Sequence, residues 1–426
     1  MSESRLDSLL AWIDASPSPY HAAHNATAEL SSVGFNRFGP DEKWEESDRV
    51  VVSWGGVVIA AAFGSRIDPD RLRFRIVGAH TDSPNLRIKP NPDSHKLGYR
   101  QLGVEVYGGV LLNSWLDRDL GLSGRVVVRD GSGNQTLLFS ANRPLLRVAQ
   151  LAIHLDREVN EGLKLDRQSH LAPIWGLGTS NDGDFRSFLA DEIGVNDSEV
   201  LSWDVMCHDL TPSTVLGRDN ELYAAPRIDN LASCHAALSA LQEIGPVGED
   251  TISVMVLFDH EEVGSESSTG AKGPMLSSAL ERLAGTRSTN REQFLRALNR
   301  SICVSADGAH AVHPNYVDRH EPEHQVVLNG GPVIKINANV RYATDAESSA
   351  LFQSVCRSAG VPVQQYAHRT NLLCGSTIGP ITAAQLGMSV VDVGSAQLSM
   401  HSAREMGGSK DPDYLFSALT EFFAGT

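Results

Sequence analysis

The stretch FDHEEVGSES, residues 258–267, places four ionisable residues side by side: Asp259, His260, Glu261 and Glu262. The preceding run TISVMVLF (251–258) is apolar and rich in β-branched residues, which predicts a central strand of a mostly parallel sheet. Open α/β sheets bind ligands at the carboxyl ends of their strands, and adjacent carboxylates repel each other unless a cation or a shared proton intervenes. The stretch therefore favours a metal site, a catalytic acid or base, or both, with a solvated loop as the alternative.

Histidines and carboxylates follow apolar runs or enter turns at four other places in the chain. These segments are GAHTDS (78–83), PRIDNLAS (226–233), SADGAHAVHPNY (305–316) and SMHSAREMGG (399–408). Because the ends of parallel strands meet at one sheet edge, two His and three or four carboxylates there fit a two-metal hydrolytic site. Zinc binds both imidazole and carboxylate readily. His80 and His401 are the histidines that best accompany the acidic strand ends, and we expect most of the other His residues to take no part.

One further motif has the letters of a zinc site but not the required context. HEPEH (320–324) matches HExxH, whose chemistry requires two His on one face of a helix. Pro322 lies between them, and no amphipathic helical pattern surrounds the motif. We therefore predict no zinc site there. The chain also has neither a GxSxG elbow nor a P-loop, so the sequence does not favour a serine hydrolase or a nucleotide-driven enzyme.

The overall composition restricts the class of protein and its partners. A length of 426 residues predicts two or three domains, or one large domain with an insertion. The net charge of −16 argues against a nucleic-acid or anionic-membrane partner. The five Cys form no CxxC pattern, which is typical of a reduced cytosolic protein.

The beginning of the chain and its longest apolar run bear on the location. The N-terminal segment has no basic region followed by an apolar core, as an export signal would. Residues 50–63 form the longest apolar run, which is shorter than the ~20 residues of a membrane span; we interpret it as a strand or hairpin. We therefore expect a cytoplasmic protein.

Both ends of the chain show the α/β alternation that would position these side chains. Strands are expected at 72–80, 251–258, 302–307, 332–340 and 389–394, and helices at about 4–14, from Ser18-Pro19, and at 230–245, 349–360 and 411–425. The middle is less regular, with strands expected at 107–112 and 124–130, a partly helical segment at 145–159 and a helix at 181–194. We predict a discontinuous α/β domain, residues 1–90 and 221–426, with a mostly parallel sheet, and an inserted β-rich domain, residues 91–220.

Motifs spread over nearly the whole chain resemble the aspartyl aminopeptidase-like M18 family of metallopeptidases. They are SPSPYHA, GAHTDSPNLRIKP, LAIHL, PRIDNLAS, DHEEVGS, SADGAHAVHPNY, GPVIKINANVRYAT, GSTIGPI and MHSAREM, and they run from residue 16 to residue 406. Several are long and specific. Ile228 stands where Leu is expected, which is a conservative difference. The resemblance implies a zinc-peptidase catalytic domain, with the β-rich insertion serving dimerisation and assembly.

The resemblance also implies a role for each residue of the site. His80 and Asp307 would hold one zinc, Glu262 and His401 the other, and Asp229 would bridge the two. Asp82 would orient the imidazole of His80. Glu261 would be the general base, taking a proton from the metal-activated water and passing it to the leaving amine. In this interpretation Glu261 and Glu262 are adjacent because one acts on water while the other binds metal.

The family further suggests substrate contacts at His154, His310, Lys335 and Tyr342. Lys335 lies in an otherwise apolar strand and could meet the acidic side chain of a substrate, with a structural salt bridge as the alternative. The family places the equivalent of His154 in the site of a neighbouring subunit; a packed core histidine is the alternative. The family also forms tetrahedral homo-dodecamers whose inward-facing sites admit short peptides.

The function expected from these observations is a dizinc aminopeptidase that removes an N-terminal residue, preferably Asp or Glu, from short peptides. Two Zn per subunit are expected, with Co or Mn as possible replacements. A dinuclear zinc deacylase or carboxypeptidase of related fold is the alternative enzyme. A non-catalytic scaffold is a third hypothesis, against which the intact Glu261 beside a full ligand set argues.

Overall fold

The computed structural model describes residues 4–131 and 133–425. They group into two compact units. The first falls within Met1–Asp82, Ser213–Met400 and Glu405–Thr426, and the second within Ser83–Pro212 and His401–Arg404. Among the described residues, no helix combines the length and apolarity that crossing a bilayer requires.

The first unit is built on a nine-stranded sheet in the order β1-β2-β3-β13-β4-β14-β18-β16-β17. The strands are β1 (Asn36–Phe38), β2 (Arg49–Trp54), β3 (Val57–Phe63), β4 (Arg73–His80), β13 (Thr251–Phe258), β14 (Ile302–Ala306), β16 (Val333–Ile336), β17 (Gln364–Ala367) and β18 (Ser389–Gly394). The central strands β13, β4, β14 and β18 are parallel to one another. Phe258 pairs with His80 and Ser305 with Gly78, so these strands end at nearly the same level of the sheet.

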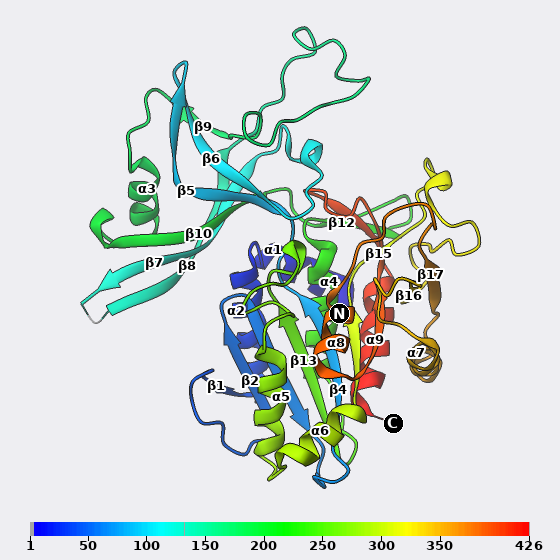
Figure 1. Ribbon diagram of the computed structural model, residues 1–426. Helices are drawn as coiled ribbons and strands as arrows, with labels where there is room; N and C mark the ends of the chain where they lie inside the picture. The colour runs from blue at the N-terminus through cyan, green and yellow to red at the C-terminus, as the bar shows by residue number, and fades with distance from the viewer. Residues whose placement is uncertain (1–3, 132, 426) are drawn as a thin grey trace. The chain divides into compact units, whose positions relative to one another are not determined.

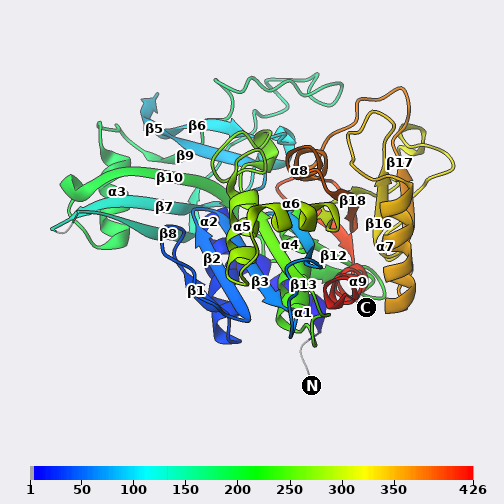
Figure 2. The ribbon, with the colours of Figure 1, turned by 60° about the horizontal axis from the view of Figure 1, so that its bottom comes forward.

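Helices cover both faces of this sheet (Figure 1 and Figure 2). One face packs against α1 (Arg5–Ala15), α2 (Pro19–Ser32), α4 (Ile228–Gln242), α7 (Ala346–Ala359) and α9 (Asp411–Ala424). The other packs against α5 (Met275–Gly285), α6 (Arg291–Asn299) and α8 (Ile378–Leu386). Successive residues of β4 alternate between the two cores, Val77 facing the first and Ile76 the second. A strand buried on both faces must be apolar throughout, which explains the continuous apolar runs in the sequence.

Local signals in the sequence set the boundaries of several elements. Ser18 caps α2, accepting a hydrogen bond from the main-chain N–H of His21, and Pro19 occupies the first turn, as predicted. The apolar run 50–63 forms the antiparallel hairpin of β2 and β3. Its turn contains Gly55 at φ 59°, a conformation that glycine adopts without strain.

A five-stranded sheet in the same unit lies beside the ends of the central strands. Its order is β11-β12-β20-β19-β15, with β11 (Thr214–Leu216), β12 (Leu222–Ala225), β15 (Ala309–His310), β19 (Ala396–Leu398) and β20 (Glu405–Gly408). β12 ends four residues before Asp229, and β15 begins two residues after Asp307. The small sheet therefore fixes the backbone just before Asp229 and just after Asp307, two predicted metal ligands.

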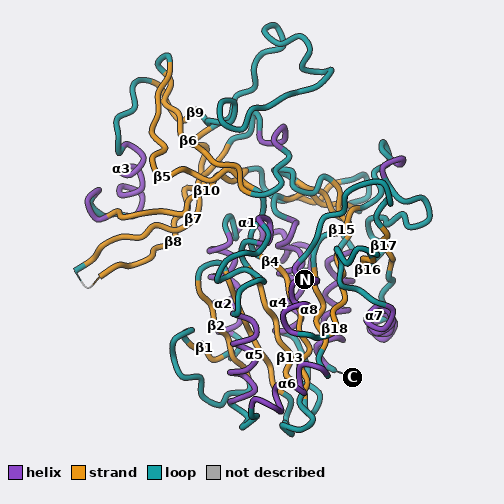
Figure 3. Tube along the Cα trace, in the orientation of Figure 1, coloured by secondary structure: helices purple, strands orange, loops and turns teal. Residues whose placement is uncertain are grey.

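The second unit is a six-stranded antiparallel sheet in the order β8-β7-β10-β5-β6-β9. Its strands are β5 (Asn85–Lys96), β6 (Tyr99–Tyr107), β7 (Leu120–Asp130), β8 (Gly133–Leu146), β9 (Ile174–Leu177) and β10 (Val200–Asp209). Figure 3 shows strands and loops in most of this unit, with α3 (Asp184–Ile193) packed through Phe185 and Leu189 into its core. An α/β sheet accompanied by a β-rich unit is the fold class that the sequence predicts.

Two expectations for this second unit were wrong. Residues 107–112 do not form a strand, because β6 ends at Tyr107 and a 3₁₀ turn covers Leu112–Trp115. Residues 145–159 contain no helix: Arg147 bridges to Ile174, and turns follow. Three of the apolar side chains that suggested a helix there, Leu151, Ile153 and Leu155, are exposed. A short amphipathic helix needs a surface on which to bury its apolar face, and none of the described residues covers these side chains.

Candidate metal centre

The register of the central sheet brings His80, Asp229 and Asp307 together. His80 is the last residue of β4, Asp307 directly follows β14, and Asp229 is in the first turn of α4. One ligand atom from each of these three buried side chains lies within 4.8 Å of the others. The Nε2 atom of His80 is 3.4 Å from Asp229 Oδ1 and 3.6 Å from Asp307 Oδ1. Segments far apart in the sequence thus form one buried group of metal-ligating type.

Glu261 and Glu262 lie beside this group. They begin the 3₁₀ turn Glu261–Val263 that follows β13, and each is partly buried. His80, Glu261 and Glu262 form a second group whose ligand atoms lie within 4.8 Å of one another. Glu261 Oε2 is 4.0 Å from His80 Nε2. The adjacent carboxylates at the end of β13 therefore face the same imidazole as the two aspartates.

Asp82 contacts both the turn that carries Glu261 and Glu262 and the imidazole of His80. The main-chain N–H groups of Glu261 and Glu262 donate to the two carboxylate oxygens of Asp82, each at 3.1 Å. The Nδ1 atom of His80 lies 2.9 Å from the Asp82 carbonyl oxygen and 3.4 Å from its carboxylate. A proton on Nδ1 leaves Nε2 as the nitrogen with the lone pair. Asp82 orients the glutamate turn as well as the imidazole, and the sequence suggested only the second role.

The electrostatics of the centre favour a cation. Burial lowers the pKa of His80, but the carboxylates of Asp229, Asp307 and Asp82 outweigh it and raise that pKa well above its usual value. The pKa of Glu261 is raised to about 8, chiefly by burial and also by Asp307, Asp82 and Asp229, against the opposing effect of His80. Imidazole nitrogen and carboxylate oxygen converging in a buried space are donors that zinc accepts, so these residues fit a zinc ion.

His401 lies in the loop between β19 and β20, both of which belong to the first unit. Residues 401–404 themselves group with the second unit. There the Nδ1 atom of His401 is 3.0 Å from the carbonyl oxygen of Gly109, and the His401 carbonyl accepts from the N–H of Leu111. A proton held on Nδ1 makes Nε2 the nitrogen that could bind metal. The ligand role of His401 stays a prediction.

Three of the predicted substrate contacts lie in the first unit. Lys335 is only 2% exposed, and its Nζ donates to the carbonyl oxygens of Asp307 (3.3 Å) and Gly308 (3.1 Å). It also lies 3.8 Å from the Asp307 carboxylate and 5.1 Å from the centre of the Tyr342 ring. His310, in β15, has its ring 6.1 Å from that of Tyr366. Lys335 therefore contacts the segment of a predicted ligand, which the sequence did not indicate.

The other residues with possible roles lie elsewhere or have local partners. His154 is exposed in a turn of the second unit, so within this chain it is not a packed core histidine. His320 and His324 of HEPEH lie on either side of a turn, and His324 contacts Glu321, in agreement with the rejection of a helical zinc motif. The Nδ1 atom of His260 faces the hydroxyls of Ser267 and Thr269, which stabilises the loop that follows β13.

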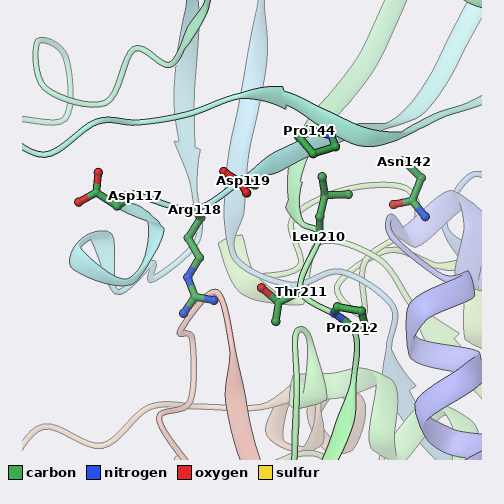
Figure 4. Close-up of a pocket in the computed structure, with 8 residues that line it drawn as sticks. All are labelled: Asp117, Arg118, Asp119, Asn142, Pro144, Leu210, Thr211 and Pro212. Carbon is green, nitrogen blue, oxygen red and sulfur yellow. The ribbon is translucent and has the colours of Figure 1, made fainter.

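A cavity of about 710 Å³ in the second unit is separate from these residues (Figure 4). It is lined by Asp117, Arg118, Asp119, Asn142, Pro144, Leu210, Thr211 and Pro212. The Arg118 guanidinium donates to the carboxylate of Asp209 (3.2 Å) and to the carbonyl of Ser114 (3.0 Å), so local acceptors already engage it. None of the residues predicted to act in catalysis lines this cavity.

A parallel α/β sheet with imidazole and carboxylates gathered at its strand ends is the arrangement of a metallohydrolase. The family profile described as aminopeptidase I zinc metalloprotease (M18) matches residues 12–423. A probable M18 family aminopeptidase 2 from Streptomyces coelicolor is 51% identical over 420 residues, covering 98% of this chain and 96% of that protein.

Solved structures show the same fold. A chain in a cryo-EM structure of the Ape4 and Nbr1 complex superposes with a TM-score of 0.95 at 36% identity, covering 99% of this chain and 85% of that one. The mApe1 dodecamer of S. cerevisiae gives a TM-score of 0.85 at 26% identity, covering 98% of this chain and 96% of that one. The chain therefore belongs to the M18 family of zinc metallopeptidases, and it is a metallo-aminopeptidase. The deacylase, carboxypeptidase and scaffold alternatives are accordingly set aside.

Proposed function

We propose that this enzyme is a dizinc aminopeptidase that removes an N-terminal Asp or Glu from short peptides. The observation that carries the proposal is the buried group of His80, Asp229 and Asp307 next to Glu261 and Glu262. His80 and Asp307 would hold one zinc and Glu262 and His401 the other, with Asp229 between them. When bound, the zinc ions supply a Lewis acid for the scissile carbonyl and lower the pKa of water. Co or Mn could replace Zn at one of the positions.

Glu261 is proposed as the general base. Its Oε2 atom faces the ligand group, and the Asp82 carboxylate fixes the main chain at its position. Burial and the neighbouring carboxylates raise the pKa of Glu261 in the metal-free site, and bound cations would lower it again, so that the carboxylate could accept a proton near neutral pH. Glu261 would accept the proton of the attacking water at this oxygen and deliver it to the leaving amine. Glu262, held by the other oxygen of Asp82, is then left to bind metal.

The preference for an acidic N-terminal residue rests on Lys335. This buried ammonium group lies beside Asp307, with Tyr342 next to it, and supplies positive charge close to the ligand group. An anionic side chain entering here would meet that charge in a place of low solvent access, where ion pairing is strong. His310 would contribute a contact to the substrate near the scissile carbonyl.

The proposed assembly is a homo-oligomer, a tetrahedral dodecamer, in which the second unit serves dimerisation and assembly. The S. cerevisiae relative is described as a dodecamer, and this chain covers 96% of that one. In such an assembly the exposed His154 would reach the site of a neighbouring subunit. Enclosed sites would restrict the substrates to short peptides.

The decisive experiment combines a metal assay with a panel of aminoacyl anilides. We expect two zinc ions per chain and hydrolysis of Asp- and Glu-anilides well above that of Ala-anilide. N-acetyl-Asp-anilide should not be cleaved, because an aminopeptidase recognises a free amino group. One zinc per chain, or equal rates for Asp, Glu and Ala, would contradict the respective part of the proposal. Sizing by light scattering tests the dodecamer independently.

A further inference from the structure

Glu405 is a buried carboxylate that contacts the main chain of a predicted metal ligand. It is the first residue of β20, pairs with Ala225 of β12 and is 2% exposed. Its Oε2 atom accepts a hydrogen bond from the main-chain N–H of Asp229 at 2.9 Å. Hydrogen bonds to a charged acceptor are among the stronger ones, and in a buried place they are little screened. Glu405 therefore restrains the backbone from which the Asp229 carboxylate extends.

The backbone at Asp229 requires such a restraint. Asp229 (φ −81°, ψ 104°) and Asn230 (φ −124°, ψ 26°) depart from helical geometry although they lie in the first turn of α4. N–H groups in a first helical turn have no acceptor within the helix. Here Glu405 supplies an acceptor from outside the helix for the main-chain N–H of Asp229, and the side-chain amide of Asn230 donates to the carbonyl of Ala306. Both partners come from segments next to the ligand group.

Gln397 connects Glu405 to the other ligand segment. Gln397 is buried in β19, and its Nε2 lies 3.5 Å from Glu405 Oε1. The same amide packs against Gly308, where an added Cβ would approach its atoms to 3.3 Å. Gly308 follows Asp307 in the chain. Asp229, Glu405, Gln397 and the Asp307 segment are thus linked by successive contacts within the first unit.

We propose that Glu405 is a positioning residue for the metal centre, which aims Asp229 at the metal through the hydrogen bond to its main-chain N–H. The proposal rests on the proposed function, in which Asp229 is a zinc ligand. Glu405 itself does not contact substrate or zinc in this account. Residues that orient ligands from outside the coordination sphere typically change metal affinity about 10–100-fold when they are replaced.

The test measures zinc affinity of the apo protein by competition with a chromophoric chelator. Glu405→Asp keeps the charge but shortens the side chain, so it should lose the hydrogen bond and bind zinc at least about tenfold more weakly. Glu405→Gln keeps an acceptor oxygen at full length and should stay within about threefold of wild type, because the hydrogen bond survives. Glu405→Ala should be the weakest binder of the three. In Glu405→Asp, kcat should fall while KM stays close to the wild-type value.

Asp411→Ala is the matched structural control. Asp411 is likewise a buried carboxylate that accepts two main-chain N–H groups, those of Asn329 (2.7 Å) and Gly331 (3.1 Å). Its replacement should lower the urea midpoint of the apo protein but leave zinc affinity unchanged. Equal loss of zinc affinity in Asp411→Ala and Glu405→Asp would assign the effect to general destabilisation and overturn the proposal.

An Asp229→Ala arm separates this inference from the proposed function. If Asp229→Ala binds zinc as wild type does, the ligand assignment itself fails. If Asp229→Ala loses zinc but Glu405→Asp binds it normally, only the positioning role fails. If Glu405→Gln loses as much affinity as Glu405→Asp, the charge and not the hydrogen bond matters, and the proposal is overturned. The Asp and Gln variants decide the question even if Glu405→Ala does not fold.

Discussion

Two carboxylate-rich regions of the molecule compensate their charge in different ways. At the cavity of the second unit, arginine is the partner: Arg147 contacts Asp119 at 2.9 Å, and Arg118 contacts Asp209 at 3.2 Å. At the centre of the first unit, Asp82, Asp229 and Asp307 surround the imidazole of His80, and Lys335 lies beside Asp307. Both regions gather acidic side chains, but among the described residues no candidate metal group includes a residue that lines the cavity.

The difference shows that the compensating partner indicates function better than the size of a cavity does. Arginine stays charged at every accessible pH and forms fixed ion pairs, so the acidic groups beside it are already neutralised. The carboxylates around His80 raise the pKa of its imidazole, so the Nε2 atom can hold a proton or, in its place, a metal cation. A small, buried group with imidazole at its centre is therefore suited to a metal, whereas the larger cavity is a set of completed salt bridges.

Neutralising the base should have the largest effect. Glu261→Gln is expected to reduce kcat by about 10²–10⁴-fold, because the water would lose its proton acceptor. Asp119→Asn at the cavity is the matched control and should leave kcat unchanged. Steady-state hydrolysis of Asp-anilide beside zinc analysis measures both. A Glu261→Gln protein that holds its zinc and works at the wild-type rate would refute the assigned mechanism.

Removing a predicted zinc ligand should weaken zinc binding more than it lowers the free energy of unfolding. Asp307→Ala is expected to weaken zinc binding by at least about 100-fold, since it removes a direct ligand and not only its support. Asp117→Ala, in the second unit, should bind zinc normally. Chelator competition gives both affinities. Comparable zinc affinity in the two variants would remove the distinction between the regions.

Removing the buried lysine should change selectivity. Lys335→Met is expected to lower kcat/KM for Asp-anilide at least about tenfold more than for Ala-anilide, because a desolvated ion pair is lost. Lys272→Met, which breaks an exposed ion pair with Glu266, is the control and should leave kcat/KM unchanged for both substrates. Lys335 also donates a hydrogen bond to the Asp307 carbonyl, so it could act only as a structural support for that segment. In that case Lys335→Met would lower kcat/KM equally for Asp-anilide and Ala-anilide, and this outcome would contradict recognition of the acidic residue.

Breaking an arginine pair of the cavity should cost stability alone. Arg118→Met leaves the buried Asp209 carboxylate without its guanidinium and is expected to lower the free energy of unfolding by about 1–3 kcal/mol. The figure is below that of a fully buried pair because Arg118 is partly exposed. Urea unfolding measures the loss, and zinc affinity should not change. A drop in zinc affinity without loss of stability would reverse the roles that we assign to the two regions.

The sequence predicted the parts of the centre that depend on strand ends. Apolar runs located β4, β13 and β14, and parallel pairing then required His80 and Asp307 to lie at one level, as the Ser305–Gly78 pair shows. Periodicity likewise predicted α4, and the short apolar run 50–63 predicted a strand or hairpin, which is the hairpin of β2 and β3. These features follow from local sequence patterns and from the rule that the carboxyl ends of parallel strands meet at one edge of the sheet.

Contacts between distant segments could not be predicted in this way. The hydrogen bond from Asp229 to Glu405 joins residues 176 positions apart and depends on the pairing of β12 with β20. The bonds of Lys335 to the Asp307 segment depend on where β16 lies relative to that loop. The segment 145–159 has a helical spacing that the tertiary structure does not use, and its apolar side chains Leu151, Ile153 and Leu155 stay exposed. Contacts of this kind cannot be predicted from a periodic pattern in the sequence.

Anomalous diffraction at the zinc edge from crystals of the zinc-loaded enzyme tests the central claim most directly. Two peaks about 3.5–4 Å apart should lie among the five predicted ligands, one bound by His80 and Asp307, the other by Glu262 and His401, with Asp229 touching both. A single peak at the site, or zinc bound only at residues 320–324, would contradict the account.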